Sequence, residues 1–200
     1  YFVASNKVIE WDGVFFVDLA KNLAQDKGYV NDFLEWILTN KNLPYNETIY
    51  PPVYPFLIMV LNYFFNNYFL AAKAISAVSG ALVVVAVYFI GKFSISRRIG
   101  VISSLISIFY LPMVKYSSLA RREMLFLALL LFSIILFLQG IKKHKKAMLI
   151  LSSIILAVAS LTRIEGILFA PIFALVYLKD KSLPFNERLK NSAVYIGIFS

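Results

Sequence analysis

The sequence predicts an all-α protein, a polytopic bundle of transmembrane helices with amphipathic helices in a large first outer loop. Three observations lead to this fold class. Hydrophobic residues make up 60% of the 200 residues and charged residues only 16%, with a mean hydropathy of +0.75, whereas soluble domains carry about 25% charged residues. Apolar runs that approach the roughly 20 residues needed to cross a bilayer recur from residue 68 onward. A long polar segment, residues 10–55, precedes them and holds seven of the eleven acidic residues.

The basic residues divide the predicted links between two sides of the membrane. Residues 92–98, 142–146 and 179–190 hold eleven of the twenty basic residues but only two acidic ones, so the whole net charge of +9 lies in these links. Short links rich in Lys and Arg stay in the cytoplasm, which places the first loop on the extracytoplasmic side. This distribution explains the basic composition, so we expect the lipid bilayer as a partner and no nucleic acid.

The outer loop is expected to span residues 10–67 within a single transmembrane domain that covers residues 1–200. Residues 1–4 resemble the last turn of a preceding span, which makes the chain an excerpt of a longer protein. Residues 12–27 have the apolar periodicity of an amphipathic helix, with Asp12 at its N-terminus and Gly28 as the residue that ends it. Residues 32–38 form a second short amphipathic turn.

Three prolines mark the start of the next helix. Pro51, Pro52 and Pro55 precede or occupy its first turn, where proline is tolerated. The apolar run that follows, residues 56–65, is too short to cross a bilayer. We therefore expect a re-entrant or interfacial helix, because a crossing here would invert the charge bias of every later link.

The remaining chain, residues 68–200, is expected to hold the membrane spans. Residues 68–91, 99 to about 116, and 123–141 are each predicted to cross. Residues 147–161 and 166–178 are too short for comfortable spans, and we interpret them as a helix pair whose outer turn, residues 162–165, dips into the membrane. The sequence has no cysteine and one histidine, which lies in a lysine cluster, so thiol chemistry is excluded.

Several polar residues on the predicted outer side are candidates for chemistry, and each has a simpler interpretation. Asp12 is either a helix cap or a general base or metal ligand. The arginines at positions 121 and 122 either anchor a helix end at the interface or clamp a phosphate, since a guanidinium binds two oxygens at once. Arg163 and Glu165 pair with each other or with a substrate. The remaining candidates are Glu123, Tyr50 and Tyr54.

These motifs together resemble the GT-C class of lipid-linked glycosyltransferases, in the branch that contains protein mannosyltransferases and the aminoarabinose transferase of lipid A. The features are an acid after the first span, the Tyr-Pro-Pro-x-Tyr-Pro helix start at 50–55, a second acid opening the fourth span, and the Leu-Thr-Arg-x-Glu-Gly link at 161–166. The resemblance covers nearly the whole chain in matching order.

The resemblance implies a multipass, inverting glycosyltransferase that takes its sugar from a polyprenyl or dolichyl phosphate at the extracytoplasmic face of the plasma membrane or endoplasmic reticulum. Asp12 and Glu123 would be the catalytic pair and the ligands of a divalent cation, Mg²⁺ or Mn²⁺, if one is used. Three arginines would bind the donor phosphate, and three further residues would belong to the substrate loop. The arginines are Arg121, Arg122 and Arg163, and the loop residues are Tyr50, Tyr54 and Glu165.

Two departures leave the subfamily and the acceptor open, whether protein, lipid or glycan. Protein mannosyltransferases tend to have Asp-Glu where this chain has Asp12-Gly13, and the aminoarabinose transferases have Glu-Lys where it has Ile49-Tyr50. The alternative class is a non-catalytic membrane protein such as a transporter or lipid flippase. A transporter would place polar groups at the middle of several spans, whereas here the mid-span positions are mostly apolar.

Overall fold

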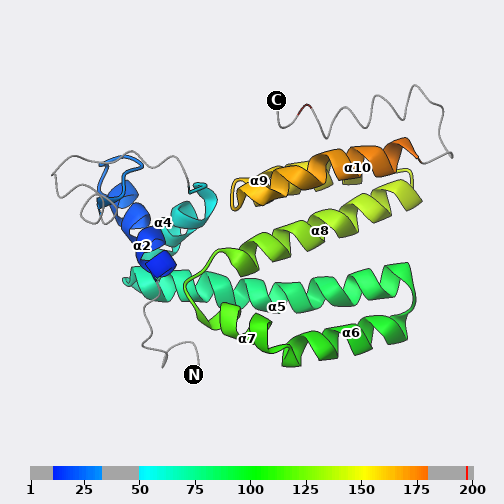
Figure 1. Ribbon diagram of the computed structural model, residues 1–200, viewed down its shortest axis with the longest axis horizontal. Helices are drawn as coiled ribbons and strands as arrows, with labels where there is room; N and C mark the ends of the chain where they lie inside the picture. Colours follow the sequence, from blue (N-terminus) through cyan, green and yellow to red (C-terminus); the bar gives the residue numbers. More distant parts are fainter. Residues whose placement is uncertain (1–10, 33–49, 180–196, 198–200) are drawn as a thin grey trace.

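The structure, a computed structural model, describes residues 11–32, 50–179 and 197. Every regular element in these ranges is helical, which confirms the all-α fold class (Figure 1). The elements in chain order are α2 (Trp11–Ala24), α4 (Val53–Phe65), α5 (Tyr68–Ser94), α6 (Arg97–Phe109), α7 (Leu111–Ser118), α8 (Glu123–Lys142), α9 (Lys146–Ser160), the 3-10 helix η1 (Ile164–Leu168) and α10 (Phe169–Leu178).

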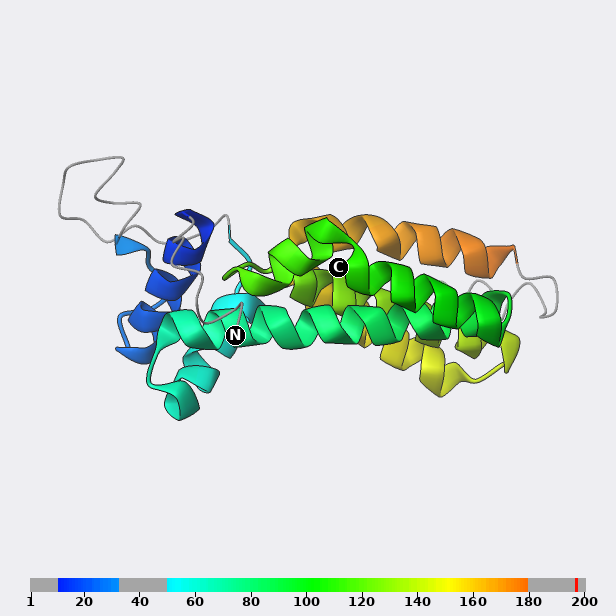
Figure 2. The same ribbon diagram turned by 90° about the horizontal axis from the view of Figure 1, so that it is seen from below.

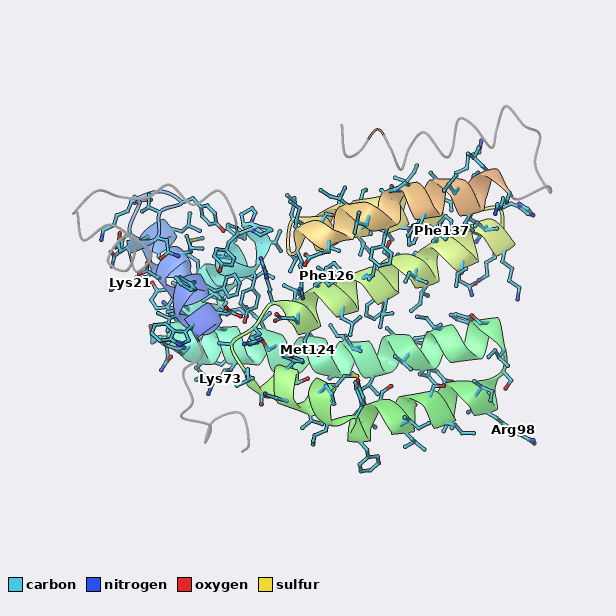
Figure 3. The ribbon with its side chains drawn as sticks, in the orientation of Figure 1. Lys21, Lys73, Arg98, Met124, Phe126 and Phe137 are labelled. Atoms are coloured by element: carbon cyan, nitrogen blue, oxygen red, sulfur yellow. The ribbon has the colours of Figure 1, made fainter. Side chains whose placement is uncertain are left out.

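The long helices lie side by side, and the outer-loop helices gather at one end of them. Figures 1 and 2 show α5, α6, α8, α9 and α10 running along the long axis of the molecule, with α2 and α4 against the first turns of α5. The α5–α6 and α8–α9 turns and the end of α10 lie at the opposite end. Figure 3 places Arg98 at that far end, away from Lys21 and Lys73. Residues 92–98 and 142–146, together with Lys179, therefore lie at one end of the bundle, as the charge pattern predicts.

Two helices are long and apolar enough to cross a membrane by themselves. Helix α5 has 27 residues and α8 has 20, with mean hydropathies of 2.2 and 2.6 over their most apolar windows. At 1.5 Å per residue they are about 40 Å and about 30 Å long, which matches the thickness of the hydrocarbon core. The chain is thus an integral membrane protein.

The segment predicted to cross the membrane, residues 99 to about 116, is a bent pair of helices. It is broken at Tyr110 into α6 and α7, whose axes differ by 60°. Pro112 lies in the first turn of α7. It has no N–H to donate to the carbonyl four residues earlier, and its ring would clash with that carbonyl in a continuous helix. Pro112 therefore accounts for the break in this segment.

Helices α6 and α7 pack closely against α5 at positions where α5 has glycine. A Cβ built on Gly91 would lie 2.8 Å from Gly100 Cα, so the two backbones touch where α5 and α6 cross. A Cβ on Gly80 would lie 2.9 Å from Ser117 Cβ in α7. Small residues allow this approach between membrane helices. Glycines of α5 thus allow close approach to two neighbouring helices.

Helix α2 follows the predicted amphipathic helix but ends earlier than expected. The residue in the left-handed conformation after its last turn is Asp26, with φ of 55°, and Lys27 N donates to Asn22 O at 3.1 Å. This hydrogen-bond pattern is a Schellman C-cap. The prediction that Gly28 ends the helix is therefore wrong. Gly28 also has a positive φ, 87°, but it belongs to the turn that follows.

Helix α4 begins at the predicted prolines and packs between α2 and α5. Its 13 residues are about 20 Å long, which is less than a bilayer core. Its buried Tyr54 and Ile58 meet Phe16 of α2 and Ala72 of α5 in one apolar cluster. The length agrees with a helix that does not cross.

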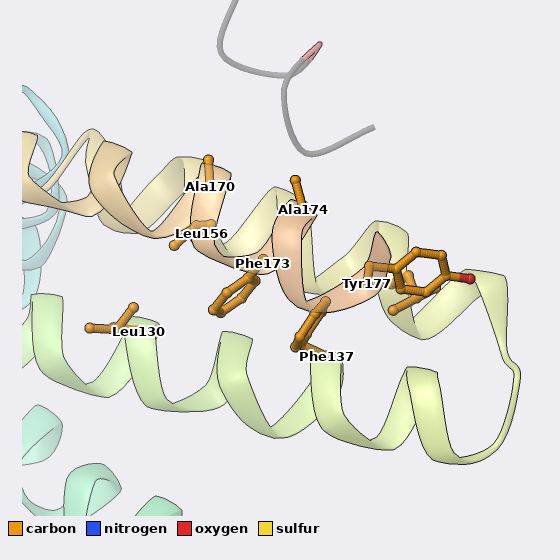
Figure 4. Packing of buried hydrophobic residues seen from close by; sticks show 8 residues of the cluster. Leu130, Phe137, Leu156, Ala170, Phe173, Ala174 and Tyr177 are labelled. Carbon is orange, nitrogen blue, oxygen red and sulfur yellow. The ribbon is translucent and has the colours of Figure 1, made fainter. Parts of the chain in front are cut away.

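The helix pair predicted after α8 is α9 and η1–α10. Figure 4 shows Phe137 of α8 beside Phe173 of α10, whose rings stack with centroids 4.4 Å apart. Between α8 and α9, Ser133 Oγ donates to Ser152 O at 2.9 Å and Ser152 Oγ donates to Ser133 O at 2.8 Å. These contacts bring the turn at 161–166 back to the end of the bundle where α2 lies.

Candidate active site

The link between α7 and α8, residues 119–122, is fixed by hydrogen bonds to a buried serine of α5. Ser76 Oγ donates to Arg121 O at 2.8 Å and accepts from Arg121 N at 3.3 Å. The Tyr54 hydroxyl lies 3.2 Å from Ser76 Oγ and donates to Ala72 O at 3.1 Å. Burial of Tyr54 raises the pKa of its hydroxyl well above its usual range. Tyr54 therefore stays protonated. Through Ser76 it helps to position the backbone of Arg121.

Helix α2 approaches the same link closely because residue 13 has no side chain. A Cβ on Gly13 would lie 3.1 Å from Ala120 Cβ and 3.2 Å from Ala120 O. This close approach brings Asp12, at the start of α2, within 3.5 Å of the Arg121 guanidinium. Gly13 thus sets the position of the first candidate acid.

Five of the predicted residues form a row of alternating charge, which we call the charged row. Arg121 lies 3.5 Å from Asp12 Oδ2 and 4.0 Å from Glu123 Oε1. Arg163 lies 3.8 Å from the same Glu123 oxygen and 2.9 Å from Glu165 Oε1. The row joins the starts of α2, α8 and η1. Asp12 and Arg121 are 109 residues apart in the sequence, and Glu123 and Arg163 are 40 residues apart. Asp12 therefore lies beside an arginine.

Arg122 lies beside the charged row in different surroundings. Its guanidinium carbon is 5.3 Å from the Phe16 ring centroid and 5.2 Å from that of Tyr50, which are cation–π distances. It forms no ion pair with a carboxylate among the described residues. Its Nη1 is buried and makes no hydrogen bond within the described part of the chain.

Glu123 has an unsatisfied hydrogen-bond acceptor, whereas Arg122 has an unsatisfied donor. Both of its ion pairs use Oε1, while Oε2 is buried and has no hydrogen-bond partner within the described ranges. Arg122 is the N-cap residue of α8 and Glu123 its first residue. One unsatisfied donor and one unsatisfied acceptor therefore stand on consecutive residues.

The turn that carries Arg163 and Glu165 is held tightly on α9. A Cβ on Gly166 would lie 2.8 Å from Ser160 Cα, and Val53 N of α4 donates to Leu161 O at 3.1 Å.

Desolvation acts to raise the pKa of Glu165. Hydrogen bonds from its own backbone N–H and from Arg163, with the charges of Arg163 and Arg122, more than offset that effect and hold the pKa below its usual value. Glu165 is thus ionised as the partner of Arg163.

The predicted substrate-loop tyrosines have different surroundings. Tyr50 is half-buried and contacts Arg122, whereas Tyr54 is completely buried and faces the helix cluster. Three further residues shape the site and were not among the candidates. Phe16 forms half of the cage around Arg122, Ser76 holds the link, and the Tyr116 ring lies 5.5 Å from the Arg121 guanidinium carbon. Their spacing in the sequence gives no signal, because each acts through a contact between helices.

The described acids do not form a metal site by themselves. No group of three or more potential ligand side chains comes together in the part of the chain that the structure describes. Asp12 and Glu123, the proposed ligands, both bind the guanidinium of Arg121, which occupies the space between them. A divalent cation at these acids stays a prediction, and no step below goes through one.

Together, the fold and the site define an integral membrane protein whose charged residues form a polar site at one end of the helices. The central parts of α5 and α8, between Lys73 and Lys92 and between Glu123 and Lys142, contain no charged residue. Such an arrangement is typical of an enzyme acting at the membrane boundary and differs from that expected of a transporter.

Comparison with protein families is consistent with this class. Residues 50–199 match the dolichyl-phosphate-mannose-protein mannosyltransferase family, and the chain belongs to it. The chain is thus a membrane glycosyltransferase of the mannosyltransferase type, and the resemblance to the GT-C class is confirmed. The match includes all three arginines, Glu123 and Glu165, and it begins after α2, so Asp12 lies outside it. No characterised protein and no solved structure matches the chain significantly.

Proposed function

We propose that this protein transfers a sugar from a polyprenyl or dolichyl phosphate to an acceptor at the extracytoplasmic face of the membrane. The observation that carries the proposal is the charged row at the end of the bundle opposite the basic links. It combines acids with arginines next to apolar helices, which suits a lipid with a phosphate and a sugar at its head. The family to which the chain belongs supports a mannosyl donor and a protein acceptor as the first pair to test.

The proposed reaction is a single inverting displacement. The acceptor hydroxyl attacks the anomeric carbon of the sugar, the bond from that carbon to the phosphate oxygen breaks, and the lipid phosphate leaves with the bonding electrons. Asp12 takes the proton of the hydroxyl. Its side chain is 43% exposed, against 25% for Glu123, so it is the more accessible acid for an incoming acceptor.

The arginines contribute mainly charge stabilisation. The leaving lipid phosphate gains negative charge in the transition state, and fixed positive groups in a partly dry site stabilise that charge strongly. Arg121, Arg122 and Arg163 stand around Glu123, and Tyr50 and Glu165 hold two of them in place. The lipid tail would lie along the apolar helices.

Transfer by the intact protein in lipid nanodiscs tests the proposal. The protein is given polyprenyl phosphate mannose with a radiolabelled sugar and a Ser/Thr-rich peptide, a glycolipid or an oligosaccharide as acceptor. Transfer of label to any of them with inversion at the anomeric carbon is expected. A protein that moves the lipid donor between leaflets of a proteoliposome without transferring the sugar is instead the transporter or flippase of the alternative interpretation.

A further inference from the structure

We propose that Arg122 binds the phosphate of the donor and Glu123 Oε2 binds a hydroxyl of the sugar on the same donor, while Arg121 and Arg163 position Glu123. This inference rests on the proposed function and divides the roles of the three arginines, which the sequence treats alike. It defines a sugar-phosphate subsite at the start of α8.

Arg121 and Arg163 already have their charge balanced by carboxylates. Arg121 pairs with Asp12 and Glu123, and Arg163 pairs with Glu123 and Glu165. A phosphate that bound either guanidinium would compete with two carboxylates for it. These arginines are therefore suited to hold the acids, with Glu123 Oε1 fixed between them.

Among the described residues, Arg122 is held by contacts with aromatic rings rather than by an ion pair. Its contacts to Phe16 and Tyr50 are made through the faces of the rings, and cation–π contacts leave the N–H groups in the guanidinium plane available. Nη1 is nevertheless buried, without a hydrogen bond inside the described ranges. A buried charged donor without an acceptor is costly, and an oxyanion removes that cost. The aromatic cage thus presents a guanidinium ready for a phosphate.

The adjacent Glu123 Oε2 requires a hydrogen-bond donor, whereas Arg122 requires an acceptor. It is a buried carboxylate oxygen with no donor among the described residues, and a sugar hydroxyl is a donor. A lipid phosphate sugar carries an oxyanion and hydroxyl groups within a few bonds of each other, so one donor molecule can satisfy both groups. The N-terminus of α8 also favours an anion here, as a secondary effect.

The two roles predict different binding behaviour for two lipids. Polyprenyl phosphate without sugar offers only the oxyanion, so its affinity should depend on Arg122 and not on Glu123 Oε2. Polyprenyl phosphate mannose should depend on both. Mannose 1-phosphate, which has no lipid, tests whether the headgroup alone is recognised.

The test measures binding of the three ligands to the intact protein in nanodiscs, for wild type, Arg122→Ala, Arg122→Lys, Glu123→Gln and Arg163→Ala. We expect Arg122→Ala to raise Kd for both lipids by about 10- to 100-fold, the range of a hydrogen bond to a charged group. Arg122→Lys should recover only part of this loss, because lysine lacks the planar fork. Glu123→Gln should raise Kd for the mannosyl lipid and leave that of the bare lipid phosphate within about twofold.

Thermal unfolding of every variant checks that it is folded. Arg163→Ala is the matched arginine control. This substitution should lower kcat while Kd for the bare lipid phosphate stays close to the wild-type value. Wild-type Kd values in Arg122→Ala, with a large loss in Arg163→Ala, would overturn the assignment. If the wild type transfers sugar but Arg122 variants bind normally, only the subsite is wrong. If the wild type binds no lipid phosphate, the proposed function fails together with it.

Discussion

At the scale of single residues, the position of Asp12 depends on its neighbour. The Cβ absent from Gly13 would lie 3.1 Å from Ala120 Cβ, so any side chain there pushes α2 away from the link that carries Arg121. The sequence shows Gly13 as a departure from the Asp-Glu pair of protein mannosyltransferases. The structure gives it a packing role, which does not depend on the nature of the acceptor.

Gly13→Ala should therefore lower kcat by up to about 10-fold, because a small displacement of the base weakens its alignment with the acceptor. Folding should change little, since the contact is a few tenths of an ångström too close. The double variant Gly13→Ala/Ala120→Gly removes one of the two close contacts and should recover part of the activity. Steady-state transfer assays on both variants check this. Wild-type kcat in the single variant would show that the approach of α2 is not needed.

Asp12→Asn removes the charge of the candidate base and keeps the size of its side chain. Asp12 is the second residue of α2 rather than the cap that precedes the helix, so no cap is lost and the variant should stay folded. Loss of a general base typically costs about 10²–10⁴-fold in rate, and transfer should fall on that order with little change in donor Kd. A folded variant with normal turnover would leave Asp12 only its ion pair with Arg121.

The Arg163–Glu165 pair should make the thermal stability of the protein decrease at acidic pH. The folded-state pKa of Glu165 is held below its usual value, so folding is favoured when the carboxyl is ionised. The contribution is fully present above the unfolded-state pKa and is lost as pH falls through the lower folded-state pKa. Thermal unfolding of wild type and Glu165→Gln should show a Tm difference at neutral pH that shrinks below about pH 4. A difference that grows in acid would contradict the ionised pair.

At the scale of elements, apolar runs predict where helices exist better than where they break. The sequence placed α4, α5, α8 and α9 correctly in type and to within a few residues. It failed where a local contact decides the outcome, as at Pro112, which divides α6 from α7, and at Asp26, which ends α2 before the glycine. The candidate site shows the same limit. Acids and arginines are visible as residue types, but the cage of Phe16 and Tyr50 around Arg122 depends on how α2 and α4 dock.

The contact between α5 and α7 should be sensitive to one methyl group. Gly80→Ala places a Cβ 2.9 Å from Ser117 Cβ, and such overpacking typically costs about 1–3 kcal/mol. Tm should fall for Gly80→Ala and recover in Gly80→Ala/Ser117→Gly, which removes the opposing side chain. The exposed neighbour supplies a control, because Ala81→Ser should leave Tm unchanged. Equal Tm values for Gly80→Ala and wild type would mean that α7 packs less closely than described.

At the scale of the whole molecule, the charge split predicts that the two ends of the bundle lie on opposite sides of the membrane. The chain has no cysteine, so single cysteines report sidedness without interference. Lys145→Cys in the basic link and Asp32→Cys after α2 should react with a membrane-impermeant thiol reagent from opposite sides of sealed vesicles. Arg98→Cys should behave like Lys145→Cys. Labelling of residues 32 and 145 from the same side would end this topology.

The charged row also implies an order of events within one turnover. Under the proposed function, the donor arrives as a phosphodiester with one negative charge and leaves as a lipid monophosphate with up to two. The proton released by the acceptor neutralises Asp12, and Arg121 then has one carboxylate partner fewer, at the moment when the phosphate gains its second charge. With the phosphate bound at Arg122, proton transfer and bond cleavage then change the charge balance of two adjacent guanidiniums together, those of Arg121 and Arg122. Release of the lipid phosphate must then reverse this exchange, and the return of Asp12 to its ionised form resets the site for the next donor.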